Sequence, residues 1–147
     1  MRPAPERTLR ELAEFWEGID RGVLRVPRCE TCGAYRWPPR PRCVTCGGVA
    51  FTWTEVAAEG TLYSWTTVGR AFLPDFAEQV PYTVGIVELT HAKPIRMVGR
   101  VLGLPADRLE VGMRLVASFE DDGGGTLCHW VQAEGCGIRS TFATHPV

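Results

Sequence analysis

Two Cys-x-x-Cys pairs constrain this 147-residue chain more than any other feature, and ten residues separate them. Pairs at this spacing are typical of two facing turns that surround one metal ion with thiolates. The predicted ligands are Cys29, Cys32, Cys43 and Cys46. Four thiolates leave no coordination position for water, so the sequence predicts a structural site. We expect zinc, although iron fits the same four sulfurs.

The residues around the cysteines predict a rubredoxin-like zinc ribbon over residues 22–55. Gly33 and Gly47 follow the two pairs directly and suit the tight turns that such ligands need. A proline-rich crossing, Trp37 to Pro41, joins the turns. We therefore expect a hairpin, a crossing and a second hairpin.

Residues 1–21 form an N-terminal helical segment in this interpretation. Apolar side chains recur at helical spacing there: Leu9, Leu12, Ala13, Phe15, Trp16 and Ile19. Thr8 is the expected N-cap, with Glu11 as its capping-box partner, so we predict a helix from Thr8 to Glu17. The helix either covers a core or docks on another protein.

Residues 56–147 have the pattern of a small β-barrel. Five runs rich in β-branched and aromatic residues follow one another: 60–68, 82–89, 95–102, 114–119 and 126–133. A short helical turn is expected at 104–109, between the third and fourth runs. The predicted fold class is thus mainly β, with a five-stranded OB-fold domain. A β-sandwich is the alternative.

Composition limits the compartment and the partners. The chain is 45% hydrophobic and 22% charged, with a net charge of −1, as in ordinary globular proteins. No apolar run reaches the roughly 20 residues that cross a bilayer, so we expect a cytoplasmic protein with no membrane partner. A local basic face is predicted in the ribbon, either as solvated surface or as a phosphate site: Arg21, Arg25, Arg28, Arg36, Arg40 and Arg42.

Catalytic groups are scarce in this sequence. There is no Gly-x-Ser-x-Gly elbow and no glycine-rich phosphate loop. We interpret Cys128 and Cys136 as small buried residues, and His129 points away from Cys128 if both lie on one strand. We assign no catalytic residue and expect no self-sufficient enzyme.

The connection over residues 70–81 is unusually apolar for a loop. It either folds back as a lid on the barrel or contacts a ligand's acyl chain or a partner protein. The candidate contact residues are Arg70, Phe72, Leu73, Phe76 and Tyr82.

Several of these motifs together resemble a known family. The matching segments are Phe15-Trp16, Gly22-Val23-Leu24, Arg28 to Gly33, Trp37-Pro38-Pro39-Arg40, Cys43 to Cys46, Gly60-Thr61-Leu62-Tyr63-Ser64-Trp65, and Pro81-Tyr82 through Leu89. The chain resembles the zinc-ribbon plus OB-fold proteins of acyl-CoA metabolism that accompany thiolase-like enzymes. Two features depart from the family pattern: Gly69 stands where many relatives have a His, and the segment Cys128-His129-Trp130 differs from the usual final strand.

The resemblance implies a non-catalytic subunit. Relatives bind thiolases, sterol-carrier-protein-like thiolases, aldolases or hydratases, stabilise them, and help to shape or bridge an acyl-CoA site. We therefore hypothesise an auxiliary or scaffold subunit of a thiolase-superfamily complex acting on acyl-CoA thioesters, with the ribbon arginines near the CoA phosphates. The alternative is a nucleic-acid-binding ribbon and OB module, which the acidic residues of the barrel disfavour.

Overall fold

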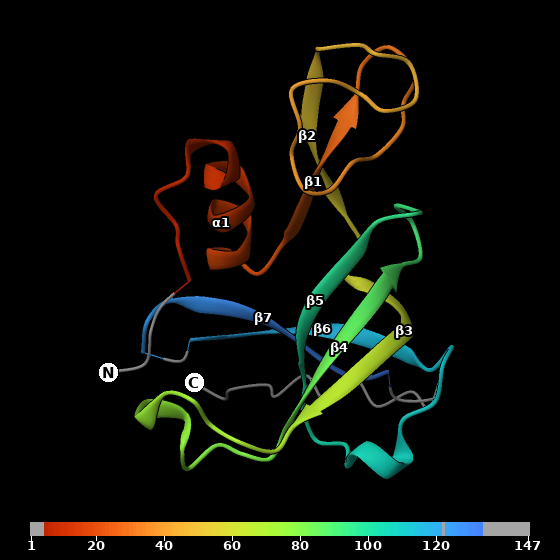
Figure 1. The fold of residues 1–147 in the computed structure, drawn as a ribbon. Coiled ribbons are helices and arrows are strands. Elements are labelled where there is room, and N and C mark those ends of the chain that lie inside the picture. Colours follow the sequence, from red (N-terminus) through yellow and green to blue (C-terminus); the bar gives the residue numbers. More distant parts are fainter. Residues whose placement is uncertain (1–4, 122, 134–147) are drawn as a thin grey trace, which may run out of the picture.

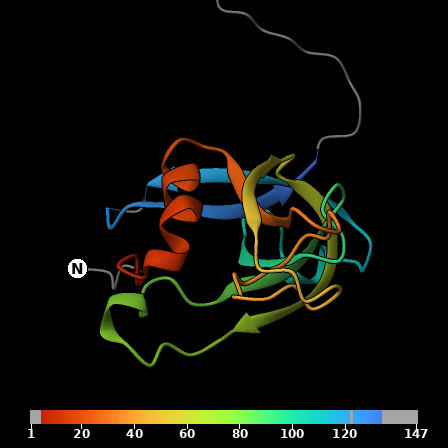
Figure 2. The same ribbon diagram turned by 90° about the horizontal axis from the view of Figure 1, so that it is seen from above.

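The computed structural model describes residues 5–121 and 123–133. The prediction for Cys136 and the end of the 56–147 unit lie outside these residues. Figure 1 shows a ribbon at the top, a short helix beside it, and a barrel below. Seen from above, the turns of the ribbon lie over the barrel (Figure 2). None of the helices in the described part has the length and apolar character needed to cross a membrane.

The N-terminal helix begins later than its sequence suggests. A 3-10 turn, η1 (Arg10–Leu12), precedes α1 (Ala13–Asp20), and neither has a side-chain cap. The predicted capping box is therefore wrong: the side chain and the N–H of Thr8 both donate to the carboxylate of Glu6 instead. The helix extends to Asp20 because its inner face, with Phe15 and Ile19, is buried against the rest of the protein.

The ribbon is built on one pair of antiparallel strands, β1 (Leu24–Cys29) and β2 (Phe51–Val56). The first predicted hairpin is present only as a short pairing of β1 with residues 34–36, whereas the full-length partner of β1 is β2, which the sequence did not predict. The two predicted turns remain as loops beyond the strands, and the first of them closes with an isolated bridge between Arg28 and Tyr35. Both cysteine pairs thus lie at the far end of a two-stranded stem.

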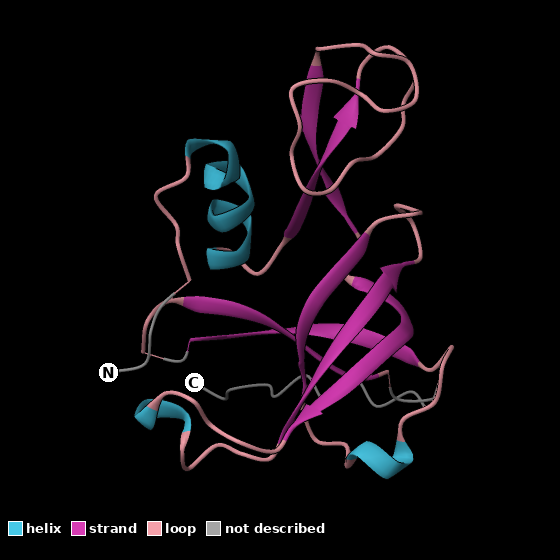
Figure 3. Ribbon diagram, viewed as in Figure 1, coloured by secondary structure: helices cyan, strands magenta, loops and turns pink. Residues whose placement is uncertain are grey.

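Five strands form the closed barrel of an OB fold. They are β3 (Glu59–Val68), β4 (Tyr82–Leu89), β5 (Arg96–Val101), β6 (Arg114–Asp121) and β7 (Thr126–Gln132). Their order in the barrel is β3-β4-β5-β7-β6, and β6 returns to pair with β3. This closure confirms the predicted barrel and excludes the sandwich. Figure 3 shows the remaining 3-10 turns, η2 (Pro74–Phe76) and η3 (Ala106–Arg108), outside the barrel wall.

One continuous core connects the barrel to the helix. Strand β4 alternates between partly buried and buried residues, as a strand with one face toward a core should. Trp130, on β7, is fully buried at the centre of this core. Phe15 and Ile19 of α1 and Leu24 of β1 belong to the same cluster. The helix and the stem of the ribbon are therefore packed onto the barrel.

Candidate metal centre and binding surfaces

The two cysteine pairs form near-identical turns. In each turn a glycine with positive φ donates its N–H to the carbonyl of the first cysteine: Gly33 to Cys29 and Gly47 to Cys43, both at 2.9 Å. The φ values are 73° and 74°, which glycine adopts without a steric penalty. The turn glycines expected from the sequence therefore have the conformation that the two turns require.

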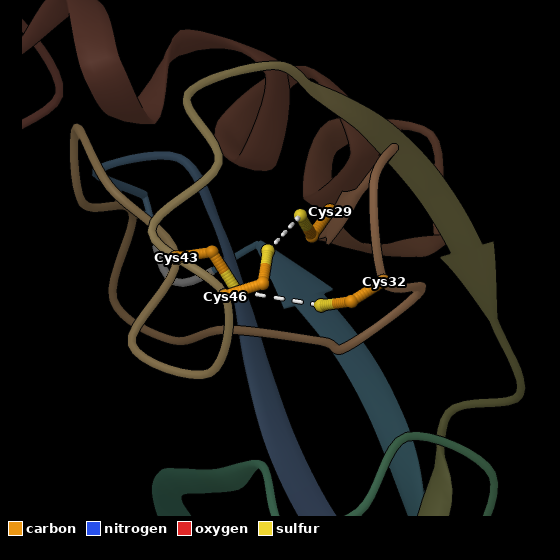
Figure 4. A group of neighbouring side chains, drawn as sticks. All are labelled: Cys29, Cys32, Cys43 and Cys46. Atoms are coloured by element: carbon orange, nitrogen blue, oxygen red, sulfur yellow. Dashed lines mark hydrogen bonds between the residues drawn. The ribbon is translucent and has the colours of Figure 1, made fainter.

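The turns bring the four sulfur atoms together (Figure 4). All four lie within 4.8 Å of one another. The Cys29 and Cys46 sulfurs are 3.7 Å apart, and those of Cys32 and Cys43 are 3.6 Å apart. A tetrahedron with metal–sulfur bonds of about 2.3 Å has edges of about 3.8 Å. The sulfur positions therefore fit a single tetrahedral ion, which the four thiolates would hold without an open position.

Backbone amides favour thiolates at two of the four positions. The amide of Cys46 is the main cause that lowers the pKa of the Cys43 thiol to about 6. The amide of Cys32 likewise lowers the pKa of Cys29. At Cys32, the amide of Ala34 acts in the same direction, but hydrogen bonds with Cys46 and other thiols raise the pKa to about 12. Metal binding at neutral pH must therefore displace a proton from Cys32.

The candidate contact residues in and beside the loop between β3 and β4 fall into two groups, one exposed and one packed. Phe72 and Leu73 are 86% and 52% exposed, and the Arg70 guanidinium lies 5.8 Å from the centre of the Phe72 ring. Phe76 instead contacts Tyr82, with ring centres 6.4 Å apart. Figure 1 shows this loop, in yellow-green, extending outward from the end of the barrel. The outer group is thus not a lid packed on the core.

Comparison with known proteins identifies this combination of parts. A family model described as the ChsH2 rubredoxin-like zinc ribbon domain matches residues 16–52, and one described as the ChsH2 C-terminal OB-fold domain matches residues 53–120. A chain in the solved structure "Ltp2-ChsH2(DUF35) aldolase" is 32% identical, with a TM-score of 0.75. The match covers 89% of this chain and 98% of that one. This chain belongs to the ChsH2 family.

Two curated relatives differ greatly in length. The "Probable enoyl-CoA hydratase alpha subunit" of Thermomonospora curvata is 34% identical over 119 residues, which are 81% of this chain and 36% of that protein. The "DUF35 domain-containing scaffold protein" of Methanocaldococcus jannaschii is 28% identical over 120 residues, which are 78% of this chain and 83% of that protein. The chain thus spans little more than a third of the hydratase subunit. Membership of the ChsH2 family confirms the resemblance that the motifs indicated.

A second surface of this ChsH2-family chain is a hollow between the helix and the barrel. It measures about 450 Å³ and is mainly apolar. Its lining includes Phe15 and Trp16 from α1, Trp37 from the proline-rich crossing, Val98 from β5 and Cys128 from β7. The hollow is not evident in the sequence, because these residues meet only through tertiary packing. The Phe15-Trp16 pair was the available signal, but its helical spacing indicated a covered core.

The predicted basic face of the ribbon is not continuous. Arg25 pairs with Glu14 at 2.6 Å, and Arg21 lies 3.4 Å from Glu17. Arg36 is buried. The remaining exposed arginines of the group are Arg28, Arg40 and Arg42. The face is divided because acidic residues of α1 neutralise two of its charges.

Cys128 is not placed as a nucleophile. Burial raises the pKa of its thiol to about 12, so the sulfur carries a proton at neutral pH. His129 follows on the same strand and is itself buried. Alternation along β7 directs the two side chains to opposite faces. The geometry therefore argues against a cysteine and histidine pair.

Proposed function

We propose that this chain is a non-catalytic scaffold subunit that binds an enzyme of the thiolase superfamily acting on acyl-CoA thioesters. Its partner is a thiolase, a sterol-carrier-protein-like thiolase or aldolase, or an acyltransferase, and the partner carries the reacting groups. The subunit stabilises the partner and helps to shape its acyl-CoA site. Zinc held by Cys29, Cys32, Cys43 and Cys46 stabilises the ribbon.

The observation that carries this proposal is the exposed apolar tip of the β3–β4 loop. Phe72 is almost fully exposed, which costs solvation free energy in a free chain and favours burial against another surface. Arg70 beside it supplies a charge that can orient the contact. The similarity to a chain of an aldolase complex, and to a protein described as a scaffold, supports the same conclusion.

Two features support a role near a CoA thioester. The exposed arginines Arg28, Arg40 and Arg42 suit the phosphates of CoA, since guanidinium groups bind phosphate oxygens in pairs. The apolar hollow beside α1 suits an acyl chain or an apolar partner segment. The phosphate contact and the acyl-chain contact are both part of the proposal and depend on the scaffold role.

The first experiment is affinity purification of the tagged protein from its native cells, with mass spectrometry of the eluate and elemental analysis of the metal. The proposal expects a thiolase-superfamily protein near one-to-one, with one zinc per chain. Recovery of nucleic acid, or of the chain alone with its own thioesterase or transferase activity, would contradict it.

A pair of variants then tests the loop. Phe72→Ala removes an 86% exposed ring, and Val111→Ala removes a 72% exposed side chain from a turn elsewhere on the barrel. If Phe72 inserts into the partner, its loss weakens the complex by about 1.5–3 kcal/mol, or roughly ten- to a hundredfold in Kd. Val111→Ala should leave Kd unchanged. Equal effects of the two variants would exclude a specific role for the loop.

The nucleic-acid alternative has weaker support. Tyr63 is exposed on the barrel and has an arginine, Arg96, 3.6 Å above its ring. That arginine is already paired with Glu88 at 3.1 Å, so it is a poor ligand for phosphate. Salt-sensitive binding of single-stranded RNA or DNA by the purified chain would restore this alternative.

A further inference from the structure

Arg36 is a buried charge inside the ribbon. Its side chain is 5% exposed, although arginine is rarely buried unless it is paired. None of its three guanidinium nitrogens has a hydrogen-bond partner among the described residues. A guanidinium group stays positively charged in proteins. The ribbon interior therefore contains a positive charge that requires a negative counterpart.

The strand register places this side chain on the same face as Cys29. The N–H of Arg36 donates to the carbonyl of Pro27, and the N–H of Cys29 donates to that of Ala34, so Pro27 lies opposite Arg36 and Cys29 opposite Ala34. Residues directly opposite in antiparallel strands point to one face, and alternate residues along a strand share it. Arg36 thus shares the face of Cys29.

The Arg36 side chain extends to Phe51, which lies on β2. The guanidinium carbon lies 4.2 Å from the centre of the Phe51 ring, and Phe51 is directly opposite Cys29 in the register of β1 and β2. Opposite residues have Cβ atoms about 4.5–5.5 Å apart. The guanidinium group therefore lies on the face of the ribbon to which Cys29 also points, without a direct hydrogen bond to a sulfur.

We propose that Arg36 is the charge counterpart of the four-cysteine metal centre. A divalent ion with four thiolates carries a net charge of about −2, and no carboxylate is within ion-pair distance of Arg36 among the described residues. Cys29 and Cys43 are buried, whereas Cys32 and Cys46 are exposed. On the buried side of the centre, this cation stabilises the thiolates and the metal complex, and the complex in turn stabilises the buried cation. The stacking on Phe51 holds the guanidinium in place.

The test is the zinc affinity of the full-length chain, measured by competition with a chromogenic chelator and repeated with cobalt. Arg36→Gln and Arg36→Met remove the charge, and Arg36→Lys keeps it. The matched control is Arg42→Met, which removes an exposed charge next to Cys43. We expect the two neutral Arg36 variants to bind zinc roughly 10–100-fold more weakly. Arg36→Lys should bind more tightly than Arg36→Gln, and the control should match the wild type.

Two results would overturn the proposal. Wild-type affinity in Arg36→Met would show that the side chain only packs against Phe51. Equal losses in Arg36→Lys and Arg36→Gln would show that the shape of the side chain, and not its charge, is required. The comparison of lysine with glutamine remains decisive if Arg36→Met folds poorly. Because the readout is metal affinity, neither result depends on whether the chain binds a thiolase-like partner.

Discussion

Gly60 is the position in the barrel where a single methyl group should be most disruptive. An ideal Cβ at Gly60 would lie 2.1 Å from the carbonyl oxygen of Glu88 and 2.8 Å from Cγ1 of Val87. The nearest contact is backbone, so no side-chain rotation can relieve it. Gly60 also pairs with both neighbouring strands, opposite Leu89 of β4 and Leu115 of β6. A larger residue must therefore separate strands of the closed barrel.

The expected cost of Gly60→Ala follows from two opposing effects. Overpacking in a well-packed core costs about 1–3 kcal/mol and occasionally more, and a backbone contact belongs at the upper end. Alanine also restricts the unfolded chain, which recovers about 0.4–1 kcal/mol. We therefore expect the free energy of unfolding to fall by about 2 kcal/mol or more. For a chain of this size the corresponding fall in Tm is roughly 4–8 °C.

The assay is urea and thermal unfolding of the metal-loaded protein, followed by tryptophan fluorescence. Gly69→Ala is the matched control, because nothing lies within 4 Å of a Cβ built there. The control should be neutral or more stable by up to about 1 kcal/mol. A free energy of unfolding for Gly60→Ala within about 0.5 kcal/mol of the wild type, or an equal loss of stability in both variants, would contradict this prediction.

Four further predictions concern the core, the metal and the loop. Trp130→Ala, which removes a fully buried side chain, should lower the free energy of unfolding by about 3–5 kcal/mol in the same assay. The pKa of Cys43 in the metal-free chain is lowered to about 6, so protons compete with zinc at this sulfur only below that value, and zinc affinity measured with a chelator dye should fall more steeply below about pH 6. Cys43→Ser should abolish tight binding at any pH, as measured by elemental analysis. Phe72→Ala should change the free energy of unfolding of the isolated chain by less than about 0.5 kcal/mol, because the ring is exposed.

The barrel was predictable because its signals are local. Strand β4 alternates residue by residue, and the sequence runs for all five barrel strands lie within a few residues of the observed ones. The number of runs and the short helical turn favoured a barrel, but the pairing of β6 with β3 that closes it could not be read from the sequence. The helix start was mispredicted because the Thr8 side chain bonds to Glu6, a local competitor that the capping pattern does not reveal.

The candidate site was predictable only where chemistry and spacing coincide. The four cysteines were found from spacing alone, and their sulfurs lie together in the structure. The burial of Arg36 was not predicted, because the arginines near it in the sequence suggested an exposed basic face. Burial of that side chain arises from a bridge between Arg28 and Tyr35 and from the position of Phe51 in another strand. Such long-range register is not readable from one sequence.

The proline-rich crossing connects the metal centre to the hollow between α1 and the barrel. The proline-rich crossing is fixed at both ends by the cysteine pairs, and it carries Trp37, whose ring lies 4.6 Å from that of Phe15. Phe15 contacts Trp16 with ring centres 5.0 Å apart, and all three rings line the hollow beside the barrel. We therefore expect loss of the metal to loosen the crossing and, with it, the position of Trp37 in this wall. If α1 and the barrel bind the proposed partner, chelation of the metal should then weaken that complex as well as the ribbon.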